Sequence, residues 1–199
     1  MMVKHGLVSA LLLLVSLAMQ GCGGARPYAA MYKSASSELS TTAQARDHRL
    51  KIHLREALVG EQGFSGFILS PYVFMERGYV VGHVDKPEQA EAVLRTARGV
   101  AGLRSVDGYL PVKPSSASTT SDVTLKAQIE SALAIAPGVV KGRVNVDVVD
   151  GQVILLGVVS GNEERLRAEQ AVSVSGVKGI TNWLLLPEPE YQSIRPRVR

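Results

Sequence analysis

The amino-acid sequence predicts an α+β fold built from two tandem copies of one αββαβ unit. The observations behind this prediction are an internal repeat, a linker-like segment between the copies and the order of helical and strand patterns within a copy. Residues 47–51 (DHRLK) align with residues 122–126 (DVTLK) at an offset of 75 positions, and later glycine-containing segments align at offsets of 75 and 74. The segment 114–121 (PSSASTTS) has the composition of a linker. We therefore expect a first domain over 47–113 and a second over 122–187.

The first helix of the second copy is expected to begin at Asp122, a residue type that favours the N-cap position. Leu125, Ile129 and Leu133 follow at helical spacing, and the Pro-Gly pair at 137–138 ends the pattern. This segment is therefore predicted to be an amphipathic helix with one buried face.

A β-hairpin is expected next. Residues 143–149 alternate between valine and polar side chains, as a half-buried strand does. Asp150-Gly151 is a strong signal for a tight turn, and residues 152–159 form the returning strand.

A second helix and a third strand complete the unit. Residues 160–163 (SGNE) have the spacing of a capping box and open a helix that runs to about Val174. In the first copy, residues 85–88 (DKPE) open the matching helix with an acidic cap and a proline in the first turn. The third strand covers 180–186. This order predicts two helices on one face of a three-stranded mixed sheet in each copy.

The N-terminus is typical of a secreted chain. Residues 1–21 carry Lys4 and then an apolar stretch too short to cross a bilayer, which predicts a signal peptide. The segment Met19-Gln20-Gly21-Cys22 resembles a bacterial lipobox, and this resemblance implies cleavage before Cys22 and acylation of its thiol, palmitate included. Cys22 is the single cysteine, so a disulfide within the chain is excluded.

The lipobox resemblance also implies a location. Under the sorting rules of such lipoproteins, Gly23 after the cysteine directs the protein to the outer membrane, lipid-anchored and facing the periplasm. Residues 22–46 would then be the lipidated cysteine and its tether, and residues 188–199 a C-terminal tail.

The charge distribution argues against nucleic acid as a partner. The chain has 22 Lys and Arg residues against 18 Asp and Glu residues, for a net charge of +4. The excess is scattered, chiefly over the two ends, whereas a nucleic-acid-binding domain gathers its positive charge on one face.

The sequence also offers no set of residues for catalysis. It lacks a Gly-x-Ser-x-Gly motif, a phosphate-binding loop and a dinucleotide fingerprint. His48 and His53 are five residues apart on a helix and so do not share a face, and the spacing of His48 and Asp47 has no recognised metal-ligand geometry. We therefore expect a non-enzymatic protein with no cofactor and no metal.

Two segments of the second copy carry a family resemblance. Residues 150–159 (DGQVILLGVV) and 174–182 (VSGVKGITN), separated by a capped helix, look like the BON domain. Two such units behind a lipobox resemble the dual-BON envelope lipoproteins of Gram-negative bacteria. The resemblance implies a non-catalytic protein that binds anionic phospholipid surfaces, supports envelope integrity and responds to envelope stress. It also implies that the first helix of the second copy, residues 122–136, meets the lipid.

The residues that this resemblance and the local chemistry assign to a lipid surface lie on that helix and just beyond it. The lipoproteins that this chain resembles carry a tryptophan near the start of this helix, where this chain has Thr124. Apolar and basic side chains would therefore make the contact here. The candidates are Thr124, Lys126, Ile135, Val139, Val140, Lys141 and Arg143. The alternative interpretation is that Val139 and Val140 cover the hairpin and the basic side chains are merely solvated. Trp183 is expected to be a packed strand residue.

A second function class stays open. The repeats would then act as an envelope adaptor or scaffold that binds proteins or cell-wall material, with only the anchor in the membrane. Sheet edges and the segment 187–199 would supply its contact surfaces. The sequence does not indicate an oligomeric state.

Overall fold

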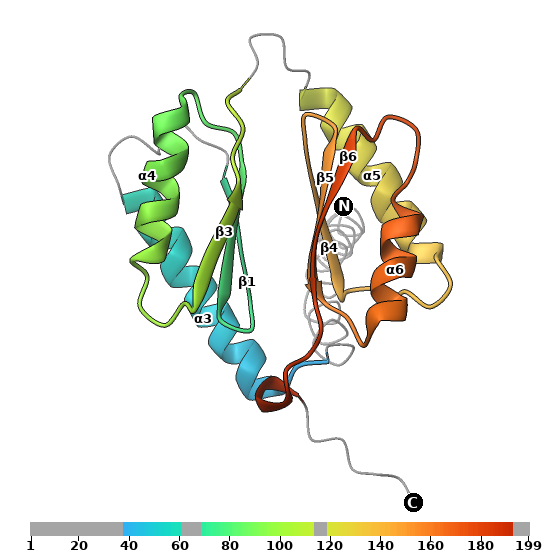
Figure 1. Cartoon of the computed structure of the whole chain (residues 1–199), viewed down its shortest axis with the longest axis horizontal. Coiled ribbons are helices and arrows are strands. Elements are labelled where there is room, and N and C mark those ends of the chain that lie inside the picture. Colours follow the sequence, from blue (N-terminus) through green and yellow to red (C-terminus); the bar gives the residue numbers. More distant parts are fainter. Residues whose placement is uncertain (1–37, 61–68, 114–118, 193–199) are drawn as a thin grey trace, which may run out of the picture. The chain divides into compact units, whose positions relative to one another are not determined.

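The computed structural model describes residues 38–60, 69–113 and 119–192, and Figure 1 shows their arrangement. The predicted αββαβ order is confirmed in both copies. The first copy contains α3 (Thr41–Gly60), β1 (Leu69–Phe74), β2 (Arg77–Gly82), α4 (Pro87–Arg98) and β3 (Ser105–Tyr109). The second contains α5 (Thr119–Ile135), β4 (Val144–Val149), β5 (Gln152–Val158), α6 (Asn162–Ala171) and β6 (Gly179–Leu185), followed by the 3₁₀ turn η2 (Pro189–Tyr191).

Each copy has a three-stranded mixed sheet, in the orders β1-β2-β3 and β4-β5-β6. The hairpin strands are antiparallel, and the third strand runs parallel to the second. Tyr72 is opposite Tyr79 in the first hairpin, and Asp147 is opposite Ile154 in the second, which is the same register 75 residues later. The repeat in the sequence is therefore a repeat in three dimensions, and the mixed-sheet prediction is confirmed.

Two helices cover one face of each sheet, as predicted (Figure 1). In the second copy, Leu125, Ile129 and Leu133 of α5 are buried in one cluster with Leu155 of β5. The matching leucines of α3 are buried with Val80 of β2. These leucines are Leu50, Leu54 and Leu58. Helical spacing of large apolar residues thus builds the same core twice.

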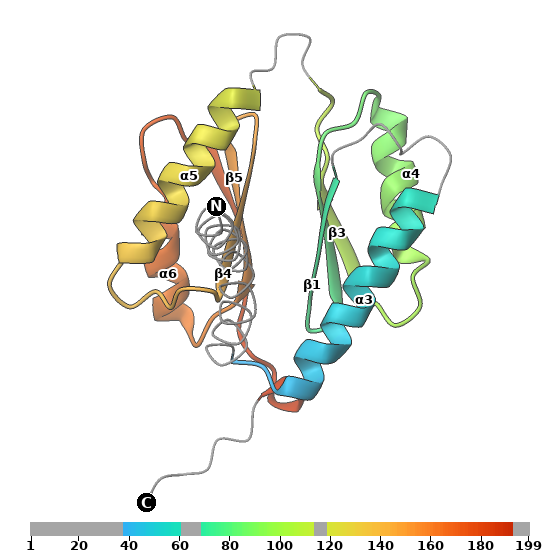
Figure 2. The ribbon, with the colours of Figure 1, turned by 180° about the vertical axis from the view of Figure 1, so that it is seen from behind.

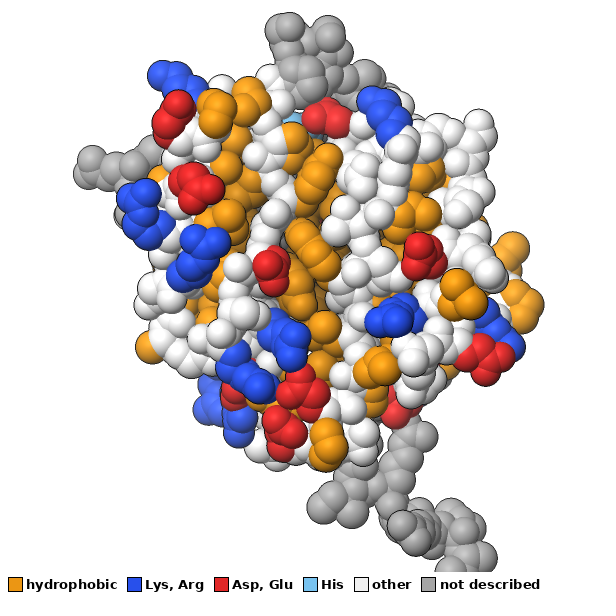
Figure 3. Space-filling view, in the orientation of Figure 1, with side chains coloured by type: hydrophobic (Ala, Val, Ile, Leu, Met, Phe, Trp, Pro, Cys, Tyr) orange, Lys and Arg blue, Asp and Glu red, His pale blue; other side chains and the backbone are white. Residues whose placement is uncertain are grey.

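The opposite faces of the two sheets form a third core, which joins the copies. Tyr79 and Val81 of β2 are buried together with Ile154 and Leu156 of β5. The ring of Trp183 on β6 lies 5.2 Å from the ring of Tyr79, centroid to centroid. Figure 3 shows hydrophobic side chains in a band between the two copies. Trp183 is therefore a packed strand residue, as expected, and each sheet is covered on both faces.

The helix start predicted at Asp122 is wrong. Helix α5 begins at Thr119, so residues 119–121 of the expected linker are helical. These residues belong to a run of Ser and Thr, which also suit a helix start. The Asp122 carboxylate instead accepts hydrogen bonds from the backbone N–H groups of Asp150 and Gly151, at 2.8 and 2.9 Å. Asp122 therefore holds the turn of the hairpin against its helix.

The start of α4 differs in part from the prediction. Pro87 occupies the first turn as expected. The expected acidic cap at Asp85 is replaced by the Gln89 side chain, whose oxygen accepts hydrogen bonds from the N–H groups of Asp85 and Lys86 at 2.9 and 2.8 Å. The N-cap position falls on Lys86, so Asp85 stands one residue too early to cap the helix.

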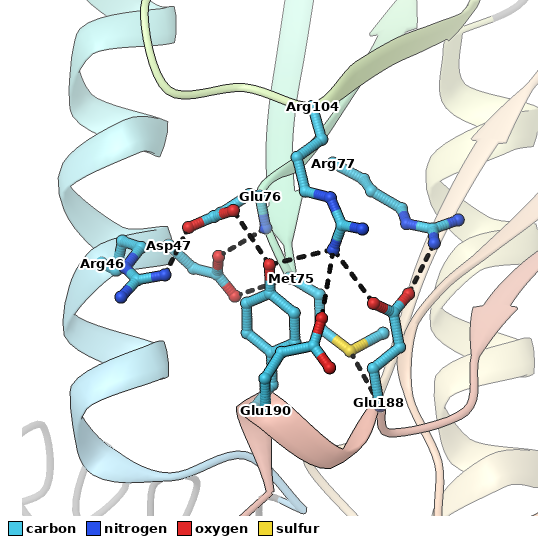
Figure 4. Close-up of polar contacts among 9 residues, drawn as sticks. Arg46, Asp47, Met75, Glu76, Arg77, Arg104, Glu188 and Glu190 are labelled. Atoms are coloured by element: carbon cyan, nitrogen blue, oxygen red, sulfur yellow. Dashed lines mark hydrogen bonds and ion pairs between the residues drawn. The ribbon is translucent and has the colours of Figure 1, made fainter.

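The segment after β6 binds to the first copy through a network of polar contacts (Figure 4). Glu188 forms ion pairs with Arg77 at 2.6 Å and with Arg104 at 3.0 Å. The Tyr191 hydroxyl donates to Glu76 at 2.9 Å and accepts from Arg104 at 3.0 Å. The first residues of the expected tail are thus held in place by the first copy.

The same segment also fixes the entry of the chain into α3. The Ser40 N–H donates to the Tyr191 carbonyl at 2.7 Å, and Leu39 forms a β-bridge with Gln192. Helix α3 begins at Thr41, six residues before the expected start of the first domain. A small buried cluster lies beneath these contacts. Its members are Leu39, Ala43, Met75, Val158 and Tyr191.

The described residues belong to one compact unit. All four apolar clusters are built by residues 39–191, so this segment contains the cores it needs to fold. Among the described residues, no helix has both the length and the apolar character needed to cross a membrane. The expected signal peptide, Cys22 and residues 114–118 of the linker lie outside the described residues.

Candidate functional site

Helix α5 exposes a face that is almost free of charge. From Ser121 onward, Glu130 is the one charged residue among its exposed side chains. Ile135 is 83% exposed and Val123 is 64% exposed, with small residues such as Ala127 and Ala134 between them. Exposed helix faces normally carry many charged side chains. This face is therefore unusual for a surface in contact with water alone.

A pocket of about 350 Å³ lies beside this helix, between α5, the following loop and β4. Its walls combine apolar side chains with three charged residues, Lys126, Glu130 and Lys141. Tyr72 of the first copy also lines it. The apolar part of the lining consists of Leu133, Ala134, Val139, Val140, Val144 and Val146.

A polar bridge beside the pocket links the two copies. The Tyr72 hydroxyl donates to one oxygen of Asp147 at 2.7 Å, and the Lys126 ammonium donates to the other at 2.7 Å. The Lys51 ammonium lies 5.1 Å from the centre of the Tyr72 ring. Burial, followed by the hydrogen bond to Asp147, raises the pKa of Tyr72, so this hydroxyl stays protonated and acts as a donor.

The loop between α5 and β4 is held by one buried carboxylate, Glu164 of α6. Glu164 accepts hydrogen bonds from the Val140 N–H at 2.9 Å, from Arg143 at 3.0 Å, and from the N–H and hydroxyl of Ser160 at 2.8 and 2.7 Å. Burial raises the pKa of Glu164, but these hydrogen bonds outweigh it and leave the pKa below its ordinary value. The capping box predicted at Glu163 is therefore wrong by one residue.

Arg143 does not face outward as expected. Its side chain is 10% exposed and forms ion pairs with both Glu164 and Glu38. Two carboxylates on the inner side of the loop attract the guanidinium more strongly than solvent does. Arg143 therefore fixes the loop.

The other predicted residues fall into two groups. Thr124 and Ile135 are exposed on α5. Lys126, Val139, Val140 and Lys141 line the pocket, with Lys126 already paired with Asp147. Sequence reasoning missed Tyr72, Asp147 and Glu164. The alternating strand pattern marks Asp147 only as one polar residue among several, and Tyr72 reaches this site from the other copy.

Groups suited to metal binding do not gather among the described residues. That part of the chain holds no cluster of three or more His, Cys, Asp or Glu side chains placed to bind a metal ion. His83 Nε2 lies 3.0 Å from Oδ2 of Asp150 in the other copy, at an angle unsuited to a hydrogen bond. This pair lies at the contact between the copies.

Comparison with known proteins assigns the second copy to a family. Residues 121–186 match the BON domain. The first copy repeats the element order, strand register and core of that domain 75 residues earlier. The second copy is therefore a BON domain, and the first copy is a BON-like unit.

Individual relatives include two bacterial proteins. The chain is 29% identical over 142 residues to "Osmotically-inducible protein Y" of Escherichia coli, covering 68% of this chain and 70% of that protein. It is 27% identical over 179 residues to "Outer membrane lipoprotein DolP" of Haemophilus influenzae, covering 86% of this chain and 91% of that protein. The C-terminal domain of CdsD, a structural protein of the Type III secretion system of Chlamydia trachomatis, aligns over 71% of this chain and 67% of that domain. Its 15% identity and TM-score of 0.29 are too low to carry an argument.

Proposed function

We propose that this chain is a non-catalytic, lipid-anchored protein of the outer membrane whose second BON domain contacts anionic phospholipid through helix α5. The observation that carries the proposal is the exposed face of α5, with Val123 and Ile135 in water and Glu130 as its one exposed charge. The similarity to an outer membrane lipoprotein over 91% of that protein's length supports the anchor and the location on the periplasmic side.

The physical character of the face suits a shallow contact with a bilayer. Burying a large aliphatic side chain completely is worth about 1.5–3 kcal/mol, so two partly buried residues give weak, reversible attachment. Stable membrane binding generally needs two signals. An acylated Cys22 would supply the first signal, and the α5 surface with Lys141 at the adjoining pocket would supply the second.

The surface contact is tested by flotation with vesicles. The fragment 36–199, which contains all four cores, is mixed with vesicles of phosphatidylcholine alone or with added phosphatidylglycerol. We expect wild type to float with the anionic vesicles and Ile135→Glu to lose most of this binding. Leu166→Glu is the matched control, because Leu166 is 56% exposed on α6, away from the α5 face. Absence of flotation for wild type, or an equal loss in both variants, contradicts the proposal.

The anchor is tested separately in cells. Radiolabelled palmitate is expected to enter the wild-type chain and to be absent from Cys22→Ala. Fractionation should then place wild type in the outer membrane and release the variant. Equal labelling of the two chains would exclude acylation of Cys22.

A further inference from the structure

Helix α3 carries a basic face at the positions that correspond to the neutral face of α5. Residues His48, Ile52, Arg55 and Val59 stand 75 positions before Val123, Ala127, Glu130 and Ala134. Their spacing of three and four residues places them on one side of the helix. All four are exposed, with Ile52 at 42% and Val59 at 68%.

The charge on this face and along its two borders is predominantly positive. Arg49, Lys51 and Arg55 are exposed on α3, and Glu56 is the acidic side chain exposed beside them. Among the described residues, neither Arg49 nor Arg55 has a carboxylate within ion-pair distance. The pKa of Lys51 is lowered, first by burial and then by the nearby Arg55. Because the cations of Lys51 and Arg55 repel each other, an anionic partner would lower the electrostatic energy of this face.

The edges of α3 and α5 that face the contact between the copies are linked by a chain of side chains. Lys51 of α3 lies over the ring of Tyr72, Tyr72 donates to Asp147, and Asp147 also accepts from Lys126 of α5. This bridge links the near edges of the two helices, and Figure 2 shows α3 and α5 on the near side at opposite flanks of the two sheets. Both helices can therefore be reached from the same side of the molecule.

We propose that the exposed face of α3 is a second contact with the anionic membrane, adjacent to the α5 contact. This inference rests on the function proposed above and extends it to the first BON-like unit. The cations of α3 supply the electrostatic attraction that the neutral α5 face lacks. Ile52 and Val59 lie between these cations, which suits phosphate groups at the membrane surface with acyl chains beneath them.

The test compares charge removal on two helices of the same unit. Arg49→Gln with Arg55→Gln removes two cations from α3, and Arg95→Gln with Arg98→Gln removes two exposed cations from α4 as a matched control. Binding of fragment 36–199 is measured to phosphatidylcholine vesicles with and without phosphatidylglycerol, at low and high salt. A basic residue near an anionic surface is worth about 1 kcal/mol, or about fivefold in binding. We therefore expect the α3 double variant to bind anionic vesicles about 5- to 25-fold more weakly and to depend less on salt.

The outcomes separate this inference from the function it extends. Unchanged binding by the α3 variant, or an equal loss in the α4 variant, overturns the α3 contact even when Ile135→Glu abolishes binding. An absence of vesicle binding by wild type overturns both. Circular dichroism of each variant shows whether it remains folded, and Arg49→Lys with Arg55→Lys should restore binding if charge is the cause.

Discussion

Asp47 and Asp122 lie 75 residues apart and make the same contact in the two copies. The Asp47 carboxylate accepts hydrogen bonds from the N–H groups of Met75 and Glu76, at 2.8 and 2.9 Å. Asp122 accepts from Asp150 and Gly151 at the same distances. Each aspartate therefore ties the turn of a hairpin to the helix that precedes it.

The contact explains how the first copy tolerates an unusual turn. Met75 and Glu76 have φ values of 49° and 61°, in the left-handed region that costs ordinary residues roughly 1–2 kcal/mol each. The second copy has Asp150 and Gly151 there, which adopt this region more readily. In the first copy, the buried Met75 side chain and the two hydrogen bonds to Asp47 offset the strain.

Replacement of either aspartate should destabilise the protein. We expect Asp122→Ala to lower the free energy of unfolding by about 1–3 kcal/mol, because two backbone N–H groups lose their acceptor. Asp47→Ala should cost at least as much, since the Met75 N–H is buried and its turn is strained. Urea denaturation measures both. Asp85→Ala, at an exposed carboxylate, should stay within about 0.5 kcal/mol of wild type. An equally small change in the free energy of unfolding for Asp122→Ala would show that the turn is stable without the aspartate.

The sequence predicts the elements of this fold better than the contacts between them. Leucines at helical spacing and a valine alternation identify α5 and β4, because local periodicity reports which face is buried. The run Val153-Ile154-Leu155-Leu156 has no such alternation, and this is the signal that both faces of β5 are covered. The partner of its second face lies in the other copy, at Tyr79 and Val81, which one strand's pattern cannot reveal.

In the candidate site too, features set by local pattern were predictable and contacts with distant elements were not. Exposure of Ile135 follows from its position off the leucine stripe of α5 and was predictable. The inward turn of Arg143 depends on Glu164 and Glu38, which lie on other elements. A basic residue in a loop has no local signal that distinguishes a solvated side chain from a structural ion pair.

The packing of the two sheets can be followed through one chromophore. Trp183 is the single tryptophan, and its ring lies 5.2 Å from that of the buried Tyr79. We expect Tyr79→Ala to cost about 3–5 kcal/mol, as truncation of a buried aromatic usually does. It should also shift the native emission of Trp183 to longer wavelength, because water reaches the ring.

A control in the other core separates these effects. Val93→Ala truncates a fully buried residue on the helix side of the first sheet. It should destabilise the protein while the native emission stays at the wild-type wavelength. Unchanged emission in Tyr79→Ala would mean that the sheets do not pack on each other in solution.

The buried Glu164 should make stability depend on pH in the acid range. Its pKa in the folded state lies below the ordinary 4.5, so its carboxylate stabilises the fold above pH 4.5. That contribution is lost as the pH falls through the folded-state pKa. Glu164→Gln should cost about 1–3 kcal/mol near neutral pH and should flatten the acid limb of the stability curve. Glu163→Gln, at an exposed residue one position away, should leave the curve unchanged. Identical acid limbs for Glu164→Gln and wild type would show that another group is responsible.

The contact between the segment after β6 and the start of α3 should respond to the loss of one oxygen atom. The hydroxyl of the buried Tyr191 donates to Glu76 and accepts from Arg104, while its carbonyl accepts from Ser40 (Figure 4). Tyr191→Phe removes both hydroxyl contacts and keeps the ring in its cluster, so we expect a loss of about 0.5–1.5 kcal/mol. Because this segment fixes the start of α3, amide exchange at Ser40 should accelerate, while exchange in the centre of β5 follows only the global change.

Glu190→Gln is the matched control for Tyr191→Phe. Glu190 is exposed and its nearest oxygen lies 3.7 Å from Arg104, a distance and exposure at which an ion pair contributes little. The stability of Glu190→Gln and its amide exchange at Ser40 should match those of wild type. If Tyr191→Phe and Glu190→Gln are indistinguishable in exchange at Ser40, then the backbone bridge between Leu39 and Gln192 holds the two ends together without help from the polar network. A shortened chain that ends at Pro187 should then be the variant that releases them, because it removes the bridge and the Tyr191 ring together.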